Sequence, residues 1–370
     1  MPANESVCGI YGTAFGPGRA RRHLQNGGQG ENPKEDLTTS PQTEPGGYEL
    51  ADPTQRLILS IFTSIVSVIG IPGNLLVIVA VVFCRKLQTK TNAFVVNLAM
   101  SDLSSCLVLP FMSLALLRDV WPLSDVVCVI VGAVILIGPL SSVVNLALIA
   151  FNRYYMITRP RSSYDRLFSR SKLIIMLFVA WIIPTMVTVV PPMLGIGGIG
   201  FNKRYKVCIT ISKKHSDLYA ILMSILVQVP CLVIIVVCYI KIYKYIDLKN
   251  RELFKNSSQL EMSKKQPNSI HAVAFKRQVQ VTKNLFMVVC SYIICIMPFS
   301  IASLIPPSYP VMPWVAVILI MNTCINPIIY GLKHAQFRQV FRFIITCKWR
   351  LIPEPSKILQ PLITNTSSSE

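Results

Sequence analysis

The chain has 370 residues, of which 52% are hydrophobic and 14% are charged, and its formal net charge is +19. So apolar a composition is unusual for a soluble protein of this length and predicts a membrane protein with several spans. The net charge alone would fit nucleic-acid binding. However, the basic residues lie between apolar runs, so we expect loops that face anionic lipid and no nucleic-acid partner.

Residues 1–56 lack an apolar run, so we expect a flexible polar tail. No signal-peptide pattern precedes the first apolar segment, which would then act as its own insertion signal. Asn4 begins an Asn-Glu-Ser glycosylation sequon, which is relevant only if this tail is extracellular.

Seven later segments are long and apolar enough to cross a bilayer. They cover approximately residues 57–84, 93–117, 125–156, 172–194, 217–246, 276–305 and 312–332. The loops after segments one, three and five and the C-terminal piece are rich in Lys and Arg, which predicts an extracellular N-terminus and a cytoplasmic C-terminus. The loop 195–216 is also basic, although it must lie outside.

The third segment is apolar but not uniformly so. Residues 128–152 carry no charge, yet they include the polar side chains of Ser141, Ser142 and Asn145. Polar groups are costly when they face lipid, so this helix is predicted to be central in an all-α, seven-helix transmembrane bundle spanning residues 57–332.

After the seventh segment, residues 333–347 are predicted to form a short amphipathic helix 8 along the inner membrane surface. Its apolar face would hold Phe337, Val340, Phe341 and Ile344. Cys347 is a palmitoylation candidate, with an unmodified cysteine as the alternative. Residues 348–370 are expected to be a disordered cytoplasmic tail, whose terminal hydroxyl cluster is a target for kinases.

Short motifs recur in the seven segments and the loops between them. In chain order they are Gly73-Asn74, Asn97 to Asp102, Trp121, Cys128, Asn152-Arg153-Tyr154, Trp181, Tyr239 to Tyr243, Cys295 to Phe299, and Asn326-Pro327 to Tyr330. This ordered set resembles that of the class A, rhodopsin-like G-protein-coupled receptors over roughly residues 57–347. Asn-Arg-Tyr, the glycine-rich stretch before Cys208 and Val281-Thr-Lys are most similar to melatonin receptors, the medium-chain fatty-acid receptor, and the insect receptors moody and trapped-in-endoderm.

The resemblance implies a disulfide between Cys128 and Cys208. It also implies a sodium site at Asp102, the one acid inside the apolar runs, together with Ser142, Asn322 and Asn326. These are oxygen-bearing side chains, as a hard cation requires. The alternative is a water-filled polar network without a specific ion. No other cofactor is expected.

At the inner end, the resemblance makes Arg153 and Tyr154 part of the G-protein coupling site, with Tyr239 and Tyr330 moving toward Arg153 on activation. Most relatives have an acid before this arginine and a glutamate at the base of segment six. Here Asn152 and Gln278 stand at those positions. Two alternatives follow. Either basal activity is raised, or hydrogen bonds from Asn152 restrain Arg153 in place of the missing acid. Pro298 and Pro327 are expected to bend their helices.

The ligand pocket implied by the resemblance has a mostly apolar wall. Its candidate residues are Ile135, Pro139, Gln228, Ile296, Ser300 and Met321. Ile135 replaces the aspartate of amine receptors, Ile296 replaces a common tryptophan, and the retinal-binding lysine is absent. These features favour a lipophilic, non-aminergic, non-retinal ligand, whereas the basic loop 195–216 favours an anionic group or is simply solvated.

The sequence therefore predicts a multi-pass plasma-membrane receptor, and not an enzyme, that passes an extracellular signal from a small molecule, lipid or peptide to a heterotrimeric G protein. Arrestin, receptor kinases and membrane lipids are further expected partners. Two alternatives stay open. One is a receptor-fold protein that binds ligand or acts in cell contact without coupling. The other is a transporter or channel, for which the chain shows neither inverted repeats nor several intramembrane charges.

Overall fold

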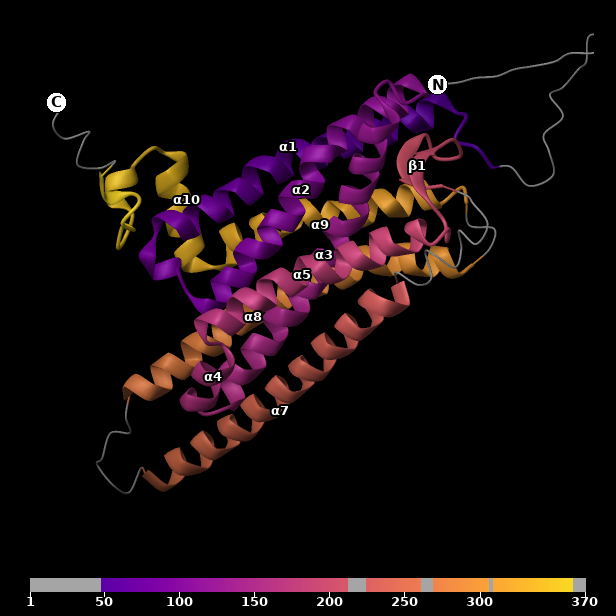
Figure 1. Cartoon of the computed structure of the whole chain (residues 1–370). Coiled ribbons are helices and arrows are strands. Elements are labelled where there is room, and N and C mark those ends of the chain that lie inside the picture. Colours follow the sequence, from indigo (N-terminus) through magenta and orange to yellow (C-terminus); the bar gives the residue numbers. More distant parts are fainter. Residues whose placement is uncertain (1–47, 212–223, 261–268, 306–308, 362–370) are drawn as a thin grey trace, which may run out of the picture. The chain divides into compact units, whose positions relative to one another are not determined.

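The computed structural model describes residues 48–211, 224–260, 269–305 and 309–361 (Figure 1). The predictions about Asn4 and the terminal hydroxyl cluster concern residues outside these ranges. Seven of the described helices are long and apolar enough to span a membrane. They are α1 (Pro53–Phe83), α2 (Lys90–Arg118), α3 (Asp125–Thr158), α5 (Arg170–Met193), α7 (Val229–Leu260), α8 (Ser269–Leu304) and α9 (Met312–Lys333). The predicted seven-helix bundle is confirmed.

The helix ends follow from local capping chemistry. The Asp52 carboxylate accepts a hydrogen bond from the Thr54 backbone N–H at 2.8 Å, which satisfies a free donor at the start of α1. The Thr89 hydroxyl does the same for Asn92 at the start of α2. That helix ends where Asp119 adopts a left-handed conformation, with φ of 62°.

α3 lies in the middle of the bundle, as its polar interior predicts. It packs against α2, α5 and α7 (Figure 1). The approach of α2 is close, because a Cβ atom at Gly138 would lie 1.9 Å from the Ser105 hydroxyl oxygen. By contrast, Val68 on α1 and Phe178 on α5 are 71% and 62% exposed, which suits contact with lipid.

Two short elements in the loops were not predicted. α4 (Arg161–Leu167) follows α3, and an antiparallel hairpin of β1 (Ile199–Asn202) and β2 (Val207–Thr210) follows α5. In the hairpin Phe201 pairs with Cys208, so the second strand carries the cysteine to the outer end of α3.

The amphipathic helix after the seventh span is α10 (Ala335–Ile345). Phe337, Val340 and Phe341 are buried as its apolar face predicts, but they are buried in protein. Phe337 packs on the rings of Tyr330 and His334, at centroid distances of 5.5 and 5.1 Å. The apolar face of α10 is therefore turned toward the bundle.

The prediction of a disordered tail from residue 348 is wrong for residues 348–361. This segment, which we call the C-terminal strap, contains the short helix η3 (Trp349–Leu351) and forms a β-bridge between Pro355 and Cys84. Ile352 and Leu359 are 3% and 1% exposed. The expectation failed because it rested on position in the chain and overlooked these apolar anchors.

Leu359→Ala should lower the free energy of unfolding by about 2–5 kcal/mol, the usual cost of removing a buried leucine side chain. The matched control is Ile358→Ala, because Ile358 is the neighbouring residue and is 60% exposed. Thermal unfolding of the purified protein in detergent measures both variants. Equal midpoints would show that the strap is not anchored through Leu359.

Candidate functional site

A polar node joins three helices at the centre of the bundle. The Asp102 carboxylate on α2 accepts hydrogen bonds from the Ser142 hydroxyl on α3 and from the Asn326 amide on α9, both at 2.7 Å. Ser101 lies 3.0 Å from the same Ser142 hydroxyl. Asp102 is fully buried. The node thus brings three of the four predicted sodium-site residues into direct contact.

The fourth residue, Asn322, is also buried on α9. Its side-chain oxygen has no hydrogen-bond partner among the described residues, and neither does the side-chain oxygen of Asn326. Buried oxygens rarely remain unpaired, so each calls for a cation or a water molecule. An additional ligand of the node would therefore have to present positive charge or a donor.

A second set of hydrogen bonds joins α2 to α3 and α5. The Asn97 amide donates to the Asn145 side-chain oxygen, and the Trp181 indole donates to the Asn97 side-chain oxygen, each at 2.9 Å. These bonds satisfy polar groups that lipid could not, and they hold three spans in register.

At the inner end of the bundle, Arg153 connects α3 to α8. Its side chain is buried, and one terminal nitrogen donates to the Gln278 side-chain oxygen at 3.1 Å and to the Met156 sulfur at 3.3 Å. Arg153 Nε has no hydrogen-bond partner in the described part of the chain. The guanidinium is thus held across the helix gap by a neutral amide.

Asn152 points away from this bond. Its oxygen accepts from the Thr91 hydroxyl at 2.7 Å, and its amide donates to the Tyr164 hydroxyl at 3.2 Å. The structure gives no hydrogen bond between Asn152 and Arg153, so the expectation that Asn152 restrains the arginine directly is wrong. Its amide and carbonyl instead join α3 to α2 and α4.

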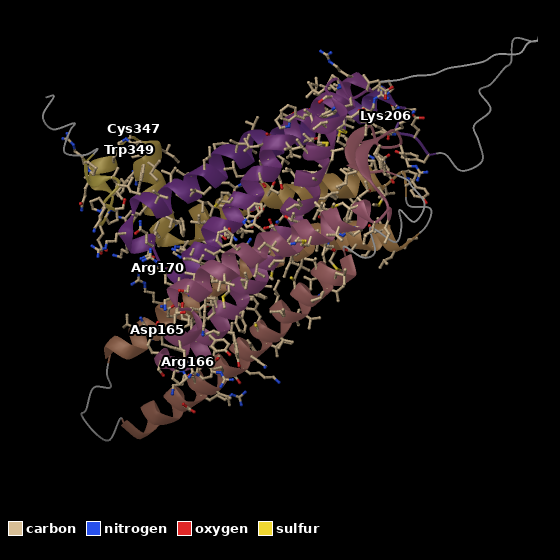
Figure 2. The ribbon with its side chains drawn as sticks, viewed as in Figure 1. Asp165, Arg166, Arg170, Lys206, Cys347 and Trp349 are labelled. Atoms are coloured by element: carbon tan, nitrogen blue, oxygen red, sulfur yellow. A yellow bond between two sulfur atoms is a disulfide. The ribbon has the colours of Figure 1, made fainter. Side chains whose placement is uncertain are left out.

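Charged residues also fix α4. The Lys90 ammonium forms an ion pair with Asp165 at 2.7 Å, and Arg161 reaches the same carboxylate at 3.0 Å. These hydrogen bonds, from Lys90 first and then Arg161, lower the pKa of Asp165. Figure 2 shows Asp165 with Arg166 and Arg170 around this short helix. Sequence reasoning missed Thr91 and Tyr164, because each acts through a partner distant in sequence.

The two tyrosines predicted to move toward Arg153 on activation pack against other aromatic rings in this structure. The hydroxyls of Tyr239 and Tyr330 are buried without a hydrogen-bond partner among the described residues. The ring of Tyr239 lies against Phe286, with 5.0 Å between centroids, and that of Tyr330 stacks on Phe337. Tyr154 accepts a hydrogen bond from Arg159 at 3.1 Å. Pro298 and Pro327 lie inside α8 and α9, and their role as bends stays a prediction.

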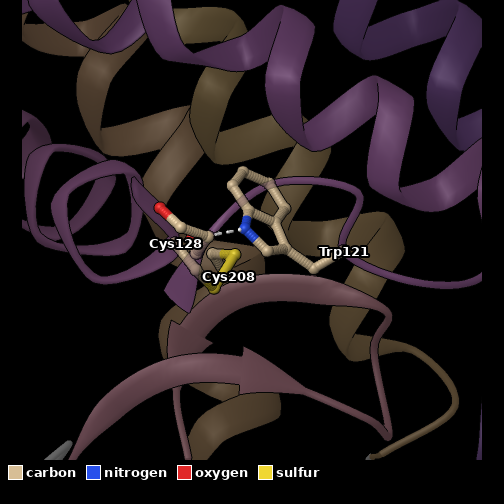
Figure 3. Close-up of a disulfide and its surroundings, with 4 residues drawn as sticks. Trp121, Cys128 and Cys208 are labelled. Carbon is tan, nitrogen blue, oxygen red and sulfur yellow. Dashed lines mark hydrogen bonds between the residues drawn. A yellow bond between two sulfur atoms is a disulfide. The ribbon is translucent and has the colours of Figure 1, made fainter. Parts of the chain in front are cut away.

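At the outer end, Cys128 and Cys208 form the disulfide that the family resemblance implied (Figure 3). It joins the hairpin to the start of α3. Nearby, the Trp121 indole donates to the Ser124 carbonyl at 2.9 Å. A Cβ at Gly132 would come within 2.7 Å of Ile199, so only glycine lets the hairpin lie this close.

The predicted pocket residues separate into two groups. Ile135 and Ile296 are buried in the bundle, and Pro139, Gln228 and Ser300 are half-buried. Met321 is 39% exposed, and its place in the pocket stays a prediction. The preceding Ile320 packs against buried residues of the bundle.

The positive charge of the outer loop is partly neutralised within the protein. Lys206 forms ion pairs with Glu49 and with Asp119, the latter at 3.1 Å, and Arg56 reaches Asp119 at 3.2 Å. Burial opposes protonation of Lys206, but the two carboxylates outweigh it and raise its pKa. Figure 2 shows Lys206 at this end. Lys206 therefore stabilises the loop and is not available to a ligand.

The segment before α1 covers this end of the bundle. Leu50 is 1% exposed, and its N–H donates to the Arg204 carbonyl at 2.9 Å. Its side chain packs with Leu59 and Leu116, beside Trp314 of α9. This contact was missed because Leu50 belongs to a stretch that reads as a polar tail.

Asn152→Ala should lower the free energy of unfolding by about 1–3 kcal/mol, because it leaves the buried Thr91 and Tyr164 hydroxyls without their partner. Tyr164→Phe and the double variant complete a thermodynamic cycle, measured by thermal unfolding in detergent. The two substitutions should be non-additive. Strict additivity would show that the Asn152–Tyr164 bond contributes nothing.

His334, at the junction of α9 and α10, should make stability depend on acid. Burial, and then the positive charges of Arg153 and Arg277, lower its pKa to about 4. The unfolded chain binds the proton more readily, so the contribution of neutral His334 is complete above pH about 6.5 and is lost as pH falls toward 4. His334→Phe should unfold at a midpoint that changes less between pH 7 and pH 4.5, in an otherwise matched thermal series. Identical pH profiles for the two proteins would contradict this.

Comparisons with known proteins agree in kind with this geometry. A sequence profile described as "7 transmembrane receptor (rhodopsin family)" matches residues 73–330. Human (Homo sapiens) 5-hydroxytryptamine receptor 4 is 27% identical over 338 residues, which cover 85% of this chain and 86% of that receptor. Melatonin receptor type 1B-B of Danio rerio is 28% identical, with 80% and 84% covered.

Two further similarities complete the comparison. The G-protein coupled receptor moody of Drosophila melanogaster is 25% identical, over 92% of this chain but 58% of its own length. The crystal structure of squid rhodopsin superposes with a TM-score of 0.68 at 23% sequence identity, and covers 80% of this chain and 88% of that chain. The latter similarity concerns the fold.

Proposed function

Because the chain belongs to the rhodopsin family of seven-transmembrane receptors, and so is a G-protein-coupled receptor and not an enzyme, we propose that a hydrogen bond from an arginine to a neutral amide keeps its inner face closed at rest. The observation that carries this proposal is the hydrogen bond from buried Arg153 to the Gln278 amide oxygen, at 3.1 Å. On activation this bond breaks, and the freed Arg153 faces the heterotrimeric G protein.

The amide partner sets the strength of this restraint. The bond to Gln278 is charge-assisted, because the Arg153 guanidinium carries a positive charge, and a carboxylate at position 278 would add the attraction between opposite charges. Gln278 accepts the bond but supplies no negative charge, and Asn152 is engaged with Thr91 and Tyr164. The resting state is accordingly held less tightly than in relatives with acids at both positions, and basal signalling is raised.

The ligand that we propose is lipophilic and is not a protonated amine. Ile135 and Ile296 are buried side chains that can offer a cation no counter-charge. 5-Hydroxytryptamine receptor 4 is named for an amine, but the aspartate that pairs with the amine in such receptors is Ile135 here. An anionic ligand gains less support, because Lys206 is already paired and Arg204 lies over the Tyr309 ring at 4.3 Å.

A sodium ion fits the polar node around Asp102. The candidate ligands of the ion are a carboxylate, the Ser142 hydroxyl and the amide oxygens of Asn322 and Asn326. The two amide oxygens have no hydrogen-bond partner among the described residues. All are hard oxygen ligands of the kind such cations prefer. When bound, the ion would supply the positive charge that a buried carboxylate otherwise lacks.

We also propose that the receptor lies in the plasma membrane with its N-terminus outside and its C-terminus in the cytoplasm. The basic loops after α1, α3 and α7 support this orientation. The disulfide at the opposite end supports it too, because disulfides persist in oxidising surroundings. Arrestin and receptor kinases remain proposed partners of the tail.

Gln278→Ala should raise G-protein activation without ligand, and Gln278→Glu should lower it, since the first removes the bond to Arg153 and the second strengthens it. A hydrogen bond with a charged partner contributes about 1.5–3 kcal/mol, so Gln278→Ala should favour the open state roughly ten- to hundredfold. Signals from each G-protein family are measured in cells at equal surface expression.

Gln280→Ala is the matched control, because Gln280 lies two residues along α8, is exposed, and its side chain donates a hydrogen bond to Asn284 on the same helix. Arg153→Ala should abolish the signal of every variant. A Gln278→Ala signal equal to that of the parent would contradict the proposed restraint. Silence of all variants in every G-protein family would instead favour a receptor fold that does not couple.

Sodium chloride should raise the thermal unfolding midpoint of the purified receptor relative to choline chloride at equal ionic strength. Asp102→Asn should remove this difference, because the amide cannot supply the negative charge that a cation requires. Ser104→Ala is a control, since the Ser104 hydroxyl bonds to the Ser101 carbonyl on the same helix. A sodium effect that survives Asp102→Asn would place the ion elsewhere.

A further inference from the structure

The C-terminal strap is fixed to the inner end of α1 by backbone pairing. The Ser356 N–H donates to the Phe83 carbonyl and the Arg85 N–H to the Glu354 carbonyl, both at 2.9 Å. Strands paired in this way lie about 4.8 Å apart. Since α1 is a candidate membrane span that ends at Phe83, the strap lies beside the end of a span.

Side chains anchor the strap at several points. Ile352 and Leu359 are buried, and the ring of Trp349 meets that of Phe83 with 5.6 Å between centroids. The Cys84 thiol donates to the Pro353 carbonyl at 3.1 Å. The strap is therefore an ordered surface, and Figure 2 shows Cys347 and Trp349 where it begins.

Large apolar side chains are among those exposed. Leu351 and Ile358 on the strap are 57% and 60% exposed, and Ile345 at the end of α10 is 69% exposed. A single exposed apolar residue needs no explanation. Three of them within one short segment, beside the end of a candidate span, do need one.

The same surface carries positive charge with little to balance it. Lys348 and Lys357 on the strap, and Arg85 and Lys86 beside it, are exposed, and their side chains have no ion pair or hydrogen bond within the part of the chain that the structure describes. Glu354 is the one acid in residues 348–361. Like charges brought together in this way repel one another unless an anionic surface lies opposite them.

We propose that the strap, together with Arg85 and Lys86, is a docking surface for the anionic inner leaflet of the membrane. Exposed apolar residues mixed with lysines on an ordered segment beside the end of a span are what an interfacial membrane contact requires. A protein partner would account for the charge, but not for the position of the strap beside the end of a candidate membrane span. The proposal rests on the cytoplasmic C-terminus proposed above, and it adds a lipid-binding surface to α10.

The test places an environment-sensitive fluorophore on Cys347, the exposed one of the described free cysteines. The purified full chain carries Cys8→Ser and is reconstituted in nanodiscs. Three lipid mixtures are compared: phosphatidylcholine alone, phosphatidylcholine with phosphatidylserine, and phosphatidylcholine with phosphatidylinositol bisphosphate at the same total charge. Emission wavelength and quenching by aqueous iodide are recorded.

Both anionic mixtures should shift the emission to shorter wavelength and reduce quenching by iodide, relative to phosphatidylcholine alone. Lys348→Gln with Lys357→Gln should lose this response, whereas the control Arg166→Gln with Arg170→Gln, two exposed cations near α4, should keep it. Equal emission in all mixtures, or loss of the response in the control as well, would overturn the proposal. A response to phosphatidylinositol bisphosphate alone would overturn it in favour of a single-headgroup site.

Both leaflets of a nanodisc have the same composition and no G protein is present, so the result does not depend on orientation or on coupling. Failure of this proposal is thereby distinguished from failure of the proposed receptor function.

Discussion

The pairing of Asp102 with Ser142 and Asn326 is the interaction on which the bundle depends. A carboxylate at membrane depth is very costly unless it is neutralised or hydrogen-bonded, so these partners must lie where they do. Because they come from α2, α3 and α9, satisfying one carboxylate fixes three helices. The Asn97–Trp181 bond extends the same constraint to α5. Polar pairing inside lipid thus supplies register that apolar packing alone would not.

The hydrogen bonds at the inner end of the bundle differ in kind from those at its centre. At the inner end a hydrogen bond runs from Arg153 on α3 to a neutral amide on α8, and Asn152 bonds to Tyr164 of α4. Under the proposed restraint, the ligand has to supply enough difference in affinity between the two states to offset this bond. The hydroxyls of Tyr239 and Tyr330 have no hydrogen-bond partner among the described residues, so an open state would be free to use them.

The sequence was sufficient to predict features that depend on a residue and its neighbours in the chain. Span length, the buried Asp102 and the motif around Arg153 predicted the seven helices and the residues of the central node. The sequence was not sufficient where the role of a residue depends on a partner that only the fold brings close. Tyr164 becomes important only because α4 brings it to Asn152, and Leu359 only because the strap returns to α1.

If the Arg153–Gln278 bond holds the inner ends of α3 and α8 together, breaking it should let these ends separate. The most direct measurement is the distance distribution between spin labels at exposed positions 166 and 276, in nanodiscs, with Cys8 and Cys347 replaced by serine. Compared with the labelled parent, Gln278→Ala should add a population at longer distance, and Gln278→Glu should narrow the distribution toward the short one. If all three distributions coincide, the inner ends are held by other contacts and the account of the resting state is wrong.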